Sequence, residues 1–287
     1  MKELHFAYRM TLRYDPPVRS QRFTLRCLPP STPMQQIQAL DVQVTPRVFL
    51  SESRDGFGNL CLYGLSEGII GSFTVTVSGD ALTGLVPGEA APPPHLLGCF
   101  RYASPLTRPG EALARLAERV GGADDAPVPY ALRCMEVMKD AFAYTPGVTG
   151  MATTAEEAAD LGQGVCQDMA HVLLALLRMK RIPCRYVCGM MLGEGASHAW
   201  VEVCDGERWI GLDPTNHHPA DDGYIRISVG RDAGDCLINR GIVTGSARQV
   251  SQISVSVREK PGAAHRPAPG ALEGHGGHLS RAEPLRH

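Results

Sequence analysis

The spacing of apolar and polar residues predicts two differently built parts along the chain. Up to about residue 83, short apolar runs alternate with polar or Pro- and Gly-containing breaks, and Phe73, Val75 and Val77 are separated by single threonines. Such alternation is typical of strands with one buried face. We therefore expect residues 1–83 to form a small antiparallel β-sandwich or barrel-like domain, with strands within 4–12, 23–28, 60–65 and 72–77.

A proline-rich segment separates this β domain from a region with helical periodicity. Residues 86–94 favour an extended polyproline conformation, so we expect 84–108 to be a connector that neither continues a sheet nor starts a helix. Apolar residues then recur at steps of three and four, which predicts helices over 109–120 and 130–144. A third helix is expected after Thr153, with Glu156 completing a capping box.

The segment 162–178 places a cysteine at the start of an apolar helix. Cys166 shares one stripe of this helix with four apolar residues, Ala170, Leu173, Leu174 and Leu177. The free N–H groups and dipole of a helix N-terminus favour a thiolate, and the N–H of Cys166 itself is free to donate to an oxyanion. A cysteine on an apolar helix face is more often a packing residue, so this position alone does not establish reactivity.

A predicted hairpin supplies partners for the thiol. Asp205-Gly206 is a strong signal for a two-residue turn, and a turn centred there would place His198 directly opposite Asp213. The carboxylate could then accept the imidazole N–H and stabilise the imidazolium. A base, its orienting acid and a thiol at a helix N-terminus are the components of cysteine nucleophilic catalysis.

Alternation divides this hairpin into two faces. We expect one apolar face formed by Ala199, Val201, Val203, Ile210 and Leu212, and a second face formed by His198, Trp200, Glu202, Trp209 and Asp213. A surface His paired with a surface Asp would have little importance. The nearby cysteine helix is what favours the catalytic interpretation.

The segments 164–171, 182–189, 198–202 and 209–215 resemble the transglutaminase-like superfamily, and more narrowly bacterial transglutaminase-like proteins with an N-terminal β domain. The segments 57–59 and 224–232 are also similar, so that the resemblance spans nearly all of residues 1–258. It implies an α+β protein whose papain-like core, residues 109–258, packs a cysteine-bearing helix on an antiparallel sheet. It further implies that Cys166 is the nucleophile, His198 the general base and acid, and Asp213 the orienter.

Other residues of these segments are candidates for supporting roles. Gln163 is a candidate second oxyanion donor because of its proximity in sequence, and Trp200 is a candidate as a neighbour of His198. Asp168 and His171 point off the stripe of Cys166, so we expect them to support the site rather than to react. By the same resemblance the segment 144–149 forms a wall of the active site, and Arg231 or Asp232 shapes the cleft.

Composition and charge limit the classes of molecule that we expect as partners. With 28 Lys+Arg against 30 Asp+Glu, no basic cluster and no long apolar run, we expect neither nucleic acid nor membrane as a partner. The N-terminus lacks the pattern of a secretory signal, which favours a cytoplasmic protein. Nine scattered cysteines indicate reduced thiols, eight of them for packing and Cys166 for chemistry. The spacing of Cys184, Cys188 and Cys204 is unlike that of a zinc site, so we expect no metal and no cofactor.

These features predict an enzyme that forms a thioester at Cys166 from a peptide, protein or amide-containing small molecule, or from an ester. The acyl group would pass to water or to an amine, and the residues named here do not decide between them. The alternative is a non-catalytic protein-binding module on the same fold, since fold does not imply function. Residues 259–287, rich in Gly, Pro, Ala and His, are expected to form a disordered tail.

Overall fold

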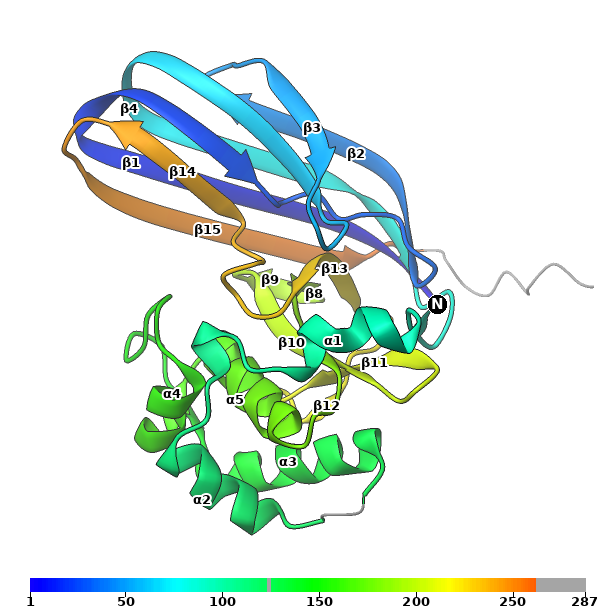
Figure 1. Ribbon diagram of the computed structural model, residues 1–287. Helices are drawn as coiled ribbons and strands as arrows, with labels where there is room; N and C mark the ends of the chain where they lie inside the picture. The colour runs from blue at the N-terminus through cyan, green and yellow to red at the C-terminus, as the bar shows by residue number, and fades with distance from the viewer. Residues whose placement is uncertain (123–124, 262–287) are drawn as a thin grey trace, which may run out of the picture.

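The computed structural model describes residues 1–122 and 125–261. Long, curved strands form one part of the molecule, and a smaller sheet with helices forms the other (Figure 1). The α+β class expected from the sequence is confirmed, with an antiparallel β module and a helix-on-sheet core. The expected tail lies almost entirely outside the described residues.

The larger sheet, called the N-terminal sheet below, has seven strands in the order β2-β4-β1-β15-β9, with β14 beside β1 and β3 beside β4. Its inner face carries the expected alternation, because Phe73, Val75 and Val77 are all fully buried. The strands are β1 (Lys2–Leu25), β2 (Gln35–Thr45), β3 (Leu50–Arg54), β4 (Leu60–Thr83), β9 (Gly193–Gly195), β14 (Asn239–Thr244) and β15 (Arg248–Glu259).

The last three of these strands correct the expected domain boundaries. β9, β14 and β15 come from the range 109–258 that we assigned to the core, yet they pair in the N-terminal sheet. β15 runs antiparallel to β1 from Leu4–Glu259 to Asp15–Arg248, so the chain returns to its starting domain. Neither these three strands nor the sheet that they join was predicted from the sequence.

The connector also differs from the expected extended segment. It contains a strand that pairs with β11 and three short helical turns, namely β5 (Glu89–Ala90), η1 (Pro94–Leu97), α1 (Gly98–Arg101) and η2 (Pro105–Thr107). Pro94 starts η1 because the fixed φ of proline suits the first turn of a helix, where no N–H partner is needed.

Four longer helices cover one face of the second sheet (Figure 1). They are α2 (Glu111–Val120), α3 (Pro127–Ala141), α4 (Ala155–Leu161) and α5 (Cys166–Met179). The capping box of α4 lies one residue later than predicted, because the hydroxyl of Thr154 accepts from Glu157 N–H while the Glu157 carboxylate accepts from Thr154 N–H. Glu156 instead caps α2, accepting from the backbone N–H groups of Gly110, Ala112 and Leu113.

The smaller sheet, called the central sheet below, has the strand order β12-β11-β10-β8-β13, with β5 beside β11. Its strands are β8 (Cys184–Met191), β10 (His198–Cys204), β11 (Arg208–Asp213), β12 (His218–Pro219) and β13 (Tyr224–Gly230). One face packs on α5, where Ala199, Val201 and Val203 are buried as expected. Ile225 and Ile227 of β13 pack against the N-terminal sheet. The central sheet therefore lies between the helices and the N-terminal sheet.

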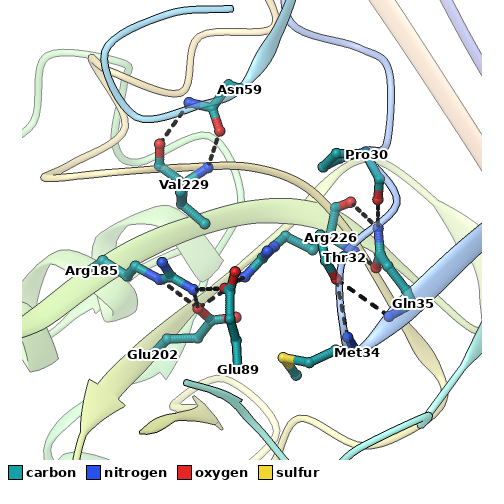
Figure 2. Close-up of polar contacts among 10 residues, drawn as sticks. All are labelled: Pro30, Thr32, Met34, Gln35, Asn59, Glu89, Arg185, Glu202, Arg226 and Val229. Atoms are coloured by element: carbon teal, nitrogen blue, oxygen red, sulfur yellow. Dashed lines mark hydrogen bonds and ion pairs between the residues drawn. The ribbon is translucent and has the colours of Figure 1, made fainter. Parts of the chain in front are cut away.

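Two buried amide side chains join the N-terminal sheet and its loops to the edge strand β13 (Figure 2). Gln35 donates to the carbonyl of Arg226 and accepts from its N–H, each at 2.8 Å. Asn59 does the same at Val229, at 2.7 and 2.8 Å. Each amide replaces the missing neighbouring strand at one residue, which satisfies backbone groups that burial would otherwise leave unpaired.

A compact ion-pair cluster lies beside these amides (Figure 2). Glu202 of β10, which is 1% exposed, pairs with Arg185 at 2.6 Å and with Arg226 at 3.4 Å. Glu89 of the connector binds the same two guanidinium groups at 2.6 and 2.7 Å. Two cations and two anions thus balance one another at the junction, and removing one would leave a buried charge without its partner.

Within the described ranges, no helix has the length and apolar character needed to cross a membrane.

Candidate active site

The start of α5 is fixed by a buried carboxylate. Asp168, 1% exposed, accepts from the N–H of Val165 at 2.8 Å and from the hydroxyl of Thr149 at 2.7 Å. A side chain at Gly164 would collide with this carboxylate, because its Cβ would lie 2.6 Å from Asp168 Oδ2. Asp168 therefore fixes the start of α5 at Cys166 and links this helix, through Thr149, to the 144–149 segment.

Cys166 lies on the first turn of α5, as the sequence predicted. It packs at the edge of the core formed by α5 and the central sheet, in which Ala170, Leu173 and Leu174 are fully buried. The thiol itself is only partly buried. The position combines a buried helix with a cysteine that is accessible from a surface cleft.

His171 lies deeper on the same helix and holds a neighbouring loop. Its Nε2 accepts from the N–H of Ala233 at 3.1 Å, and its ring packs against Tyr186 with centroids 5.4 Å apart. Burial lowers the pKa of His171 to about 4, so its imidazole is neutral at pH 7. Its contacts are those of a packing residue.

The hairpin register differs from the predicted one by two residues. Val201 pairs with Leu212 and Cys204 with Trp209, so that His198 is diagonal to Asp213 rather than directly opposite. The turn begins at Asp205, whose Oδ1 accepts from the N–H groups of Glu207 and Arg208, and this moves the turn centre to residues 206–207.

A slip of two residues leaves every side chain on its predicted face, because the period of a strand is two. His198 Nε2 therefore still lies 2.7 Å from Asp213 Oδ2. The prediction of direct opposition was wrong, whereas the predicted contact between these two side chains is present. A diagonal pair is within reach of side chains of this length.

Asp213 is fully buried, and both of its oxygens are occupied. Oδ2 accepts from His198, from the Tyr224 hydroxyl at 2.7 Å and from Asn216 Nδ2 at 2.7 Å. Oδ1 accepts from the N–H groups of Thr215 and Asn216. Burial alone would raise the pKa of Asp213, but the hydrogen bonds from His198, Tyr224 and Asn216 lower it to about 2.

Sequence reasoning did not single out Tyr224 or Asn216 as partners of Asp213. Tyr224 opens β13, the strand that Gln35 and Asn59 hold, and Asn216 follows the carboxylate by three residues. Tyr224 fell within a segment noted for its family resemblance, but nothing in its spacing indicated a bond to Asp213.

The protonation of His198 is set by opposing influences. Burial lowers the pKa of the imidazole, while the hydrogen bond to Asp213, the charge of Asp213 and the neighbouring Cys166 raise it to about 9. Since Nε2 is bound to Asp213, Nδ1 is the nitrogen left for the thiol. The Trp200 ring, 2% exposed, stacks near the imidazole with centroids 6.4 Å apart and limits its movement.

Cys166 and His198 open into one surface cleft of about 200 Å³. Its other walls are Tyr144, the segment 191–197 that leads into β10, and Val255 of β15. Tyr144 thus lies where the family resemblance implied a wall.

Other sequence candidates lie outside the lining of this cleft. Gln163 lies in the two-residue strand β7 (Gln163–Gly164), which pairs in parallel with β6 (Ala143–Tyr144). The expectation that Arg231 or Asp232 shapes the cleft is wrong: Arg231 forms a two-bond ion pair with Asp235, and Asp232 accepts from Gly234 N–H. These contacts stabilise the loop after β13.

All nine cysteines fall in described residues and are free thiols. Seven are buried, and Cys166 is partly buried. Cys99 is exposed, which corrects the expectation that every cysteine other than Cys166 serves packing. In the part of the chain that the structure describes, no cluster of three or more His, Cys, Asp or Glu side chains is arranged to hold a metal ion.

Family models agree with the division into a β module and a helix-on-sheet core. Residues 114–214 match the transglutaminase-like superfamily, and residues 4–81 match the bacterial transglutaminase-like N-terminal region. The chain belongs to the transglutaminase-like superfamily.

Its relatives include an uncharacterized protein of Mycobacterium tuberculosis, 31% identical over an alignment of 247 residues that covers 72% of this chain and 76% of that protein. An uncharacterized protein of Mycobacterium leprae is 40% identical over an alignment of 112 residues that covers 36% of this chain and 40% of that protein. The crystal structure of a "putative cysteine protease" from Cytophaga hutchinsonii superposes with a TM-score of 0.77 at 20% identity, over 95% of this chain and 94% of that one. At this identity the likeness supports the fold alone.

Proposed function

We propose that the protein is a cysteine-dependent acyl-transfer enzyme in which Cys166 is the nucleophile, His198 the general base and acid, and Asp213 the residue that orients His198. The observation that carries the proposal is the shared opening of Cys166 and His198 into one cleft, with a fully buried carboxylate behind the imidazole. The cysteine protease description of the Cytophaga hutchinsonii structure is consistent with this chemistry.

The electrostatics of His198 and Asp213 favour an imidazolium at neutral pH. With the pKa of His198 at about 9 and that of Asp213 at about 2, the imidazole is positively charged and the carboxylate negatively charged between these limits. The imidazolium and the N-terminus of α5 both stabilise negative charge on the sulfur. This arrangement supports an activated nucleophile at Cys166.

Acylation begins when the Cys166 thiolate attacks the carbonyl carbon of the donor and forms a C–S bond. The carbonyl oxygen becomes an oxyanion, which the N–H of Cys166 at the helix N-terminus is placed to bind. His198 then gives its proton to the leaving nitrogen or oxygen as the bond to the carbonyl carbon breaks. A thioester and a neutral imidazole remain.

Deacylation reverses the roles of the same groups. His198 takes a proton from an incoming water or amine, which attacks the thioester carbonyl, and the C–S bond breaks. Water yields a carboxylic acid and an amine yields a new amide. Both routes restore the thiolate and imidazolium, so one triad serves a peptidase, an amidase or an amide-forming transferase.

Competition between two thiols of the same chain tests the proposal. Cys99 is exposed and Cys166 only partly so, and an unactivated Cys166 should therefore react more slowly with iodoacetamide. We expect Cys166 to label at least tenfold faster at pH 7, as followed by intact-mass and peptide mass spectrometry, and His198→Ala to abolish this advantage. Faster labelling of Cys99, or an advantage that survives His198→Ala, would refute activation.

A second experiment distinguishes catalysis from binding, and acyl transfer to water from acyl transfer to an amine. A peptide library is incubated with the wild type or with Cys166→Ala, with and without a primary amine, and products are identified by mass. Hydrolysis products or amine adducts that require Cys166 support the enzyme and identify the acceptor. Peptide capture that is equal in both proteins, without turnover, would support the binding module instead.

A further inference from the structure

The cleft beside Cys166 and His198 is lined mainly by apolar side chains. Tyr144, Met191, Leu192 and Val255 surround the two reactive residues. Among the described residues, the one carboxylate in the lining, that of Glu194, lies 2.5 Å from Arg258 at the exposed rim. The described part of the lining therefore offers contact to an apolar group, and it holds no buried charge other than the thiol and imidazole to recognise an ionic one.

Part of this lining comes from the N-terminal sheet. β15 pairs with the short strand β9, where Val255 faces Gly195 and Val257 faces Gly193. Val255 is 5% exposed and contributes to the cleft although it lies 57 residues after His198 in the chain. Val255 of the N-terminal sheet thus lines the same cleft as Cys166 of α5 and His198 of the central sheet.

The two glycines of β9 leave space beside Val255. Residues directly opposite each other in an antiparallel pair project to the same face, so a side chain at position 195 would project on the same face as Val255. A Cβ placed on Gly195 or Gly193 would meet no atom within 4 Å. The room that these side chains would fill remains open to a ligand.

β9 is also the last strand of its sheet. Within the described ranges β9 pairs only with β15, so its other backbone edge is available to an extended chain. Addition of a strand to such an edge is a common mode of peptide recognition, in which neighbouring pockets select side chains. At about 200 Å³ the cleft is smaller than the roughly 300–1,000 Å³ of small-molecule pockets, and its size suits a single side chain.

We propose that the acyl donor is an extended polypeptide whose residue at the attacked carbonyl carries an apolar side chain, and that Val255 is a specificity-determining residue for it. This inference rests on the proposed function. The peptide lies along β9, its side chain enters the space over Gly195, and the side chain of Val255 limits its size.

Peptidyl chloromethyl ketones that differ only in the residue bearing the reactive carbonyl test this assignment. The thiolate of Cys166 displaces chloride from their methylene carbon, so their rates report recognition without depending on the acyl acceptor. Each rate is divided by the iodoacetamide rate of the same protein, which separates recognition from thiol reactivity. For the wild type we expect Leu to exceed Asp, Lys and Gly by at least tenfold, the lower end of what one apolar pocket contact provides.

Two variants change the cleft from opposite walls. Val255→Ala should enlarge it and raise the Phe-to-Leu ratio at least fivefold. Gly195→Leu should fill it and lower the Leu-to-Gly ratio at least tenfold, and no existing atom obstructs the added Cβ. Ile253→Ala is the matched control, because Ile253 lies two residues earlier on the same face of β15 and outside the cleft lining.

The outcomes separate this inference from the proposed function. The inference would be overturned if the wild type reacted equally fast with the Leu, Asp and Lys chloromethyl ketones, or if neither variant altered the rate ratios. The proposed function would still stand in that case if iodoacetamide labelled Cys166 rapidly. Absence of that labelling in the wild type would reject both. Selectivity that shifts in Val255→Ala and Gly195→Leu but not in Ile253→Ala would support the assignment.

Discussion

Replacing Asp213 by Asn tests the electrostatic basis of the site. The amide has nearly the shape of the carboxylate but no charge, and its NH2 group cannot accept the hydrogen bond from His198 Nε2. Burial of the imidazole, which lowers its pKa, persists in the variant. Because Cys166 still raises this pKa in the variant, we expect the pKa of His198 to fall from about 9 toward its ordinary 6.5.

The magnitude follows from the wild-type value. The difference between the ordinary 6.5 and about 9 corresponds to about 3 kcal/mol of preference for the imidazolium, at about 1.4 kcal/mol for each pKa unit. At pH 7.5 the wild-type imidazole is more than nine-tenths protonated, whereas the protonated fraction in Asp213→Asn decreases toward the roughly one-tenth of an imidazole with the ordinary pKa of 6.5. Loss of the orienting carboxylate also favours the wrong tautomer, so acyl transfer should slow on the order of 10³-fold or more.

NMR titration of the histidine ring signals measures this pKa directly, with the His198 signal identified by its absence in His198→Gln. Asp205→Asn is the matched control, because it makes the same substitution in the turn of the same hairpin. We expect the control to titrate near 9 and to keep the iodoacetamide rate of Cys166 at pH 7. A His198 pKa that remained near 9 in Asp213→Asn would refute the reasoning.

Three further predictions concern stability. Gln35→Leu removes hydrogen bonds to two backbone carbonyls and one N–H, so the free energy of unfolding measured by urea denaturation should fall by about 2–4 kcal/mol. The same substitution at the exposed Gln43 should lower it by less than about 0.5 kcal/mol. Equal losses would contradict the role of the Gln35 amide. Leu173→Ala, at a fully buried position, should lower the free energy of unfolding by about 2–5 kcal/mol, and a loss under 1 would contradict the described packing. Folding raises the pKa of His198, so its contribution to stability is complete below pH 6.5 and is lost as pH rises through about 9. Between pH 6.5 and 9.5 the free energy of unfolding should therefore fall by about 2–3 kcal/mol less in His198→Gln than in the wild type. Equal falls in the two proteins would contradict this linkage.

Local patterns in the sequence predicted the elements of the site well. The apolar stripe placed Cys166 on the first turn of its helix, because burial on one side imposes a helical period. Alternation placed His198 and Asp213 on one face of a hairpin, and that assignment survived a wrong register because the slip was an even number of residues. Neighbouring candidates for a turn or cap, such as Thr153 and Thr154, were harder to separate because both hydroxyls can accept a backbone N–H.

By itself the sequence predicted which segments have a helical or a strand period, where α5 begins and which face of the hairpin carries His198 and Asp213. Only the tertiary structure decided that β14 and β15 return to the N-terminal sheet, that Tyr224 and Asn216 bind Asp213, and that Val255 lines the cleft. The physical reason is that periodicity reports burial along a short segment. Pairing between strand edges far apart in the chain depends instead on which surfaces meet when the whole molecule closes.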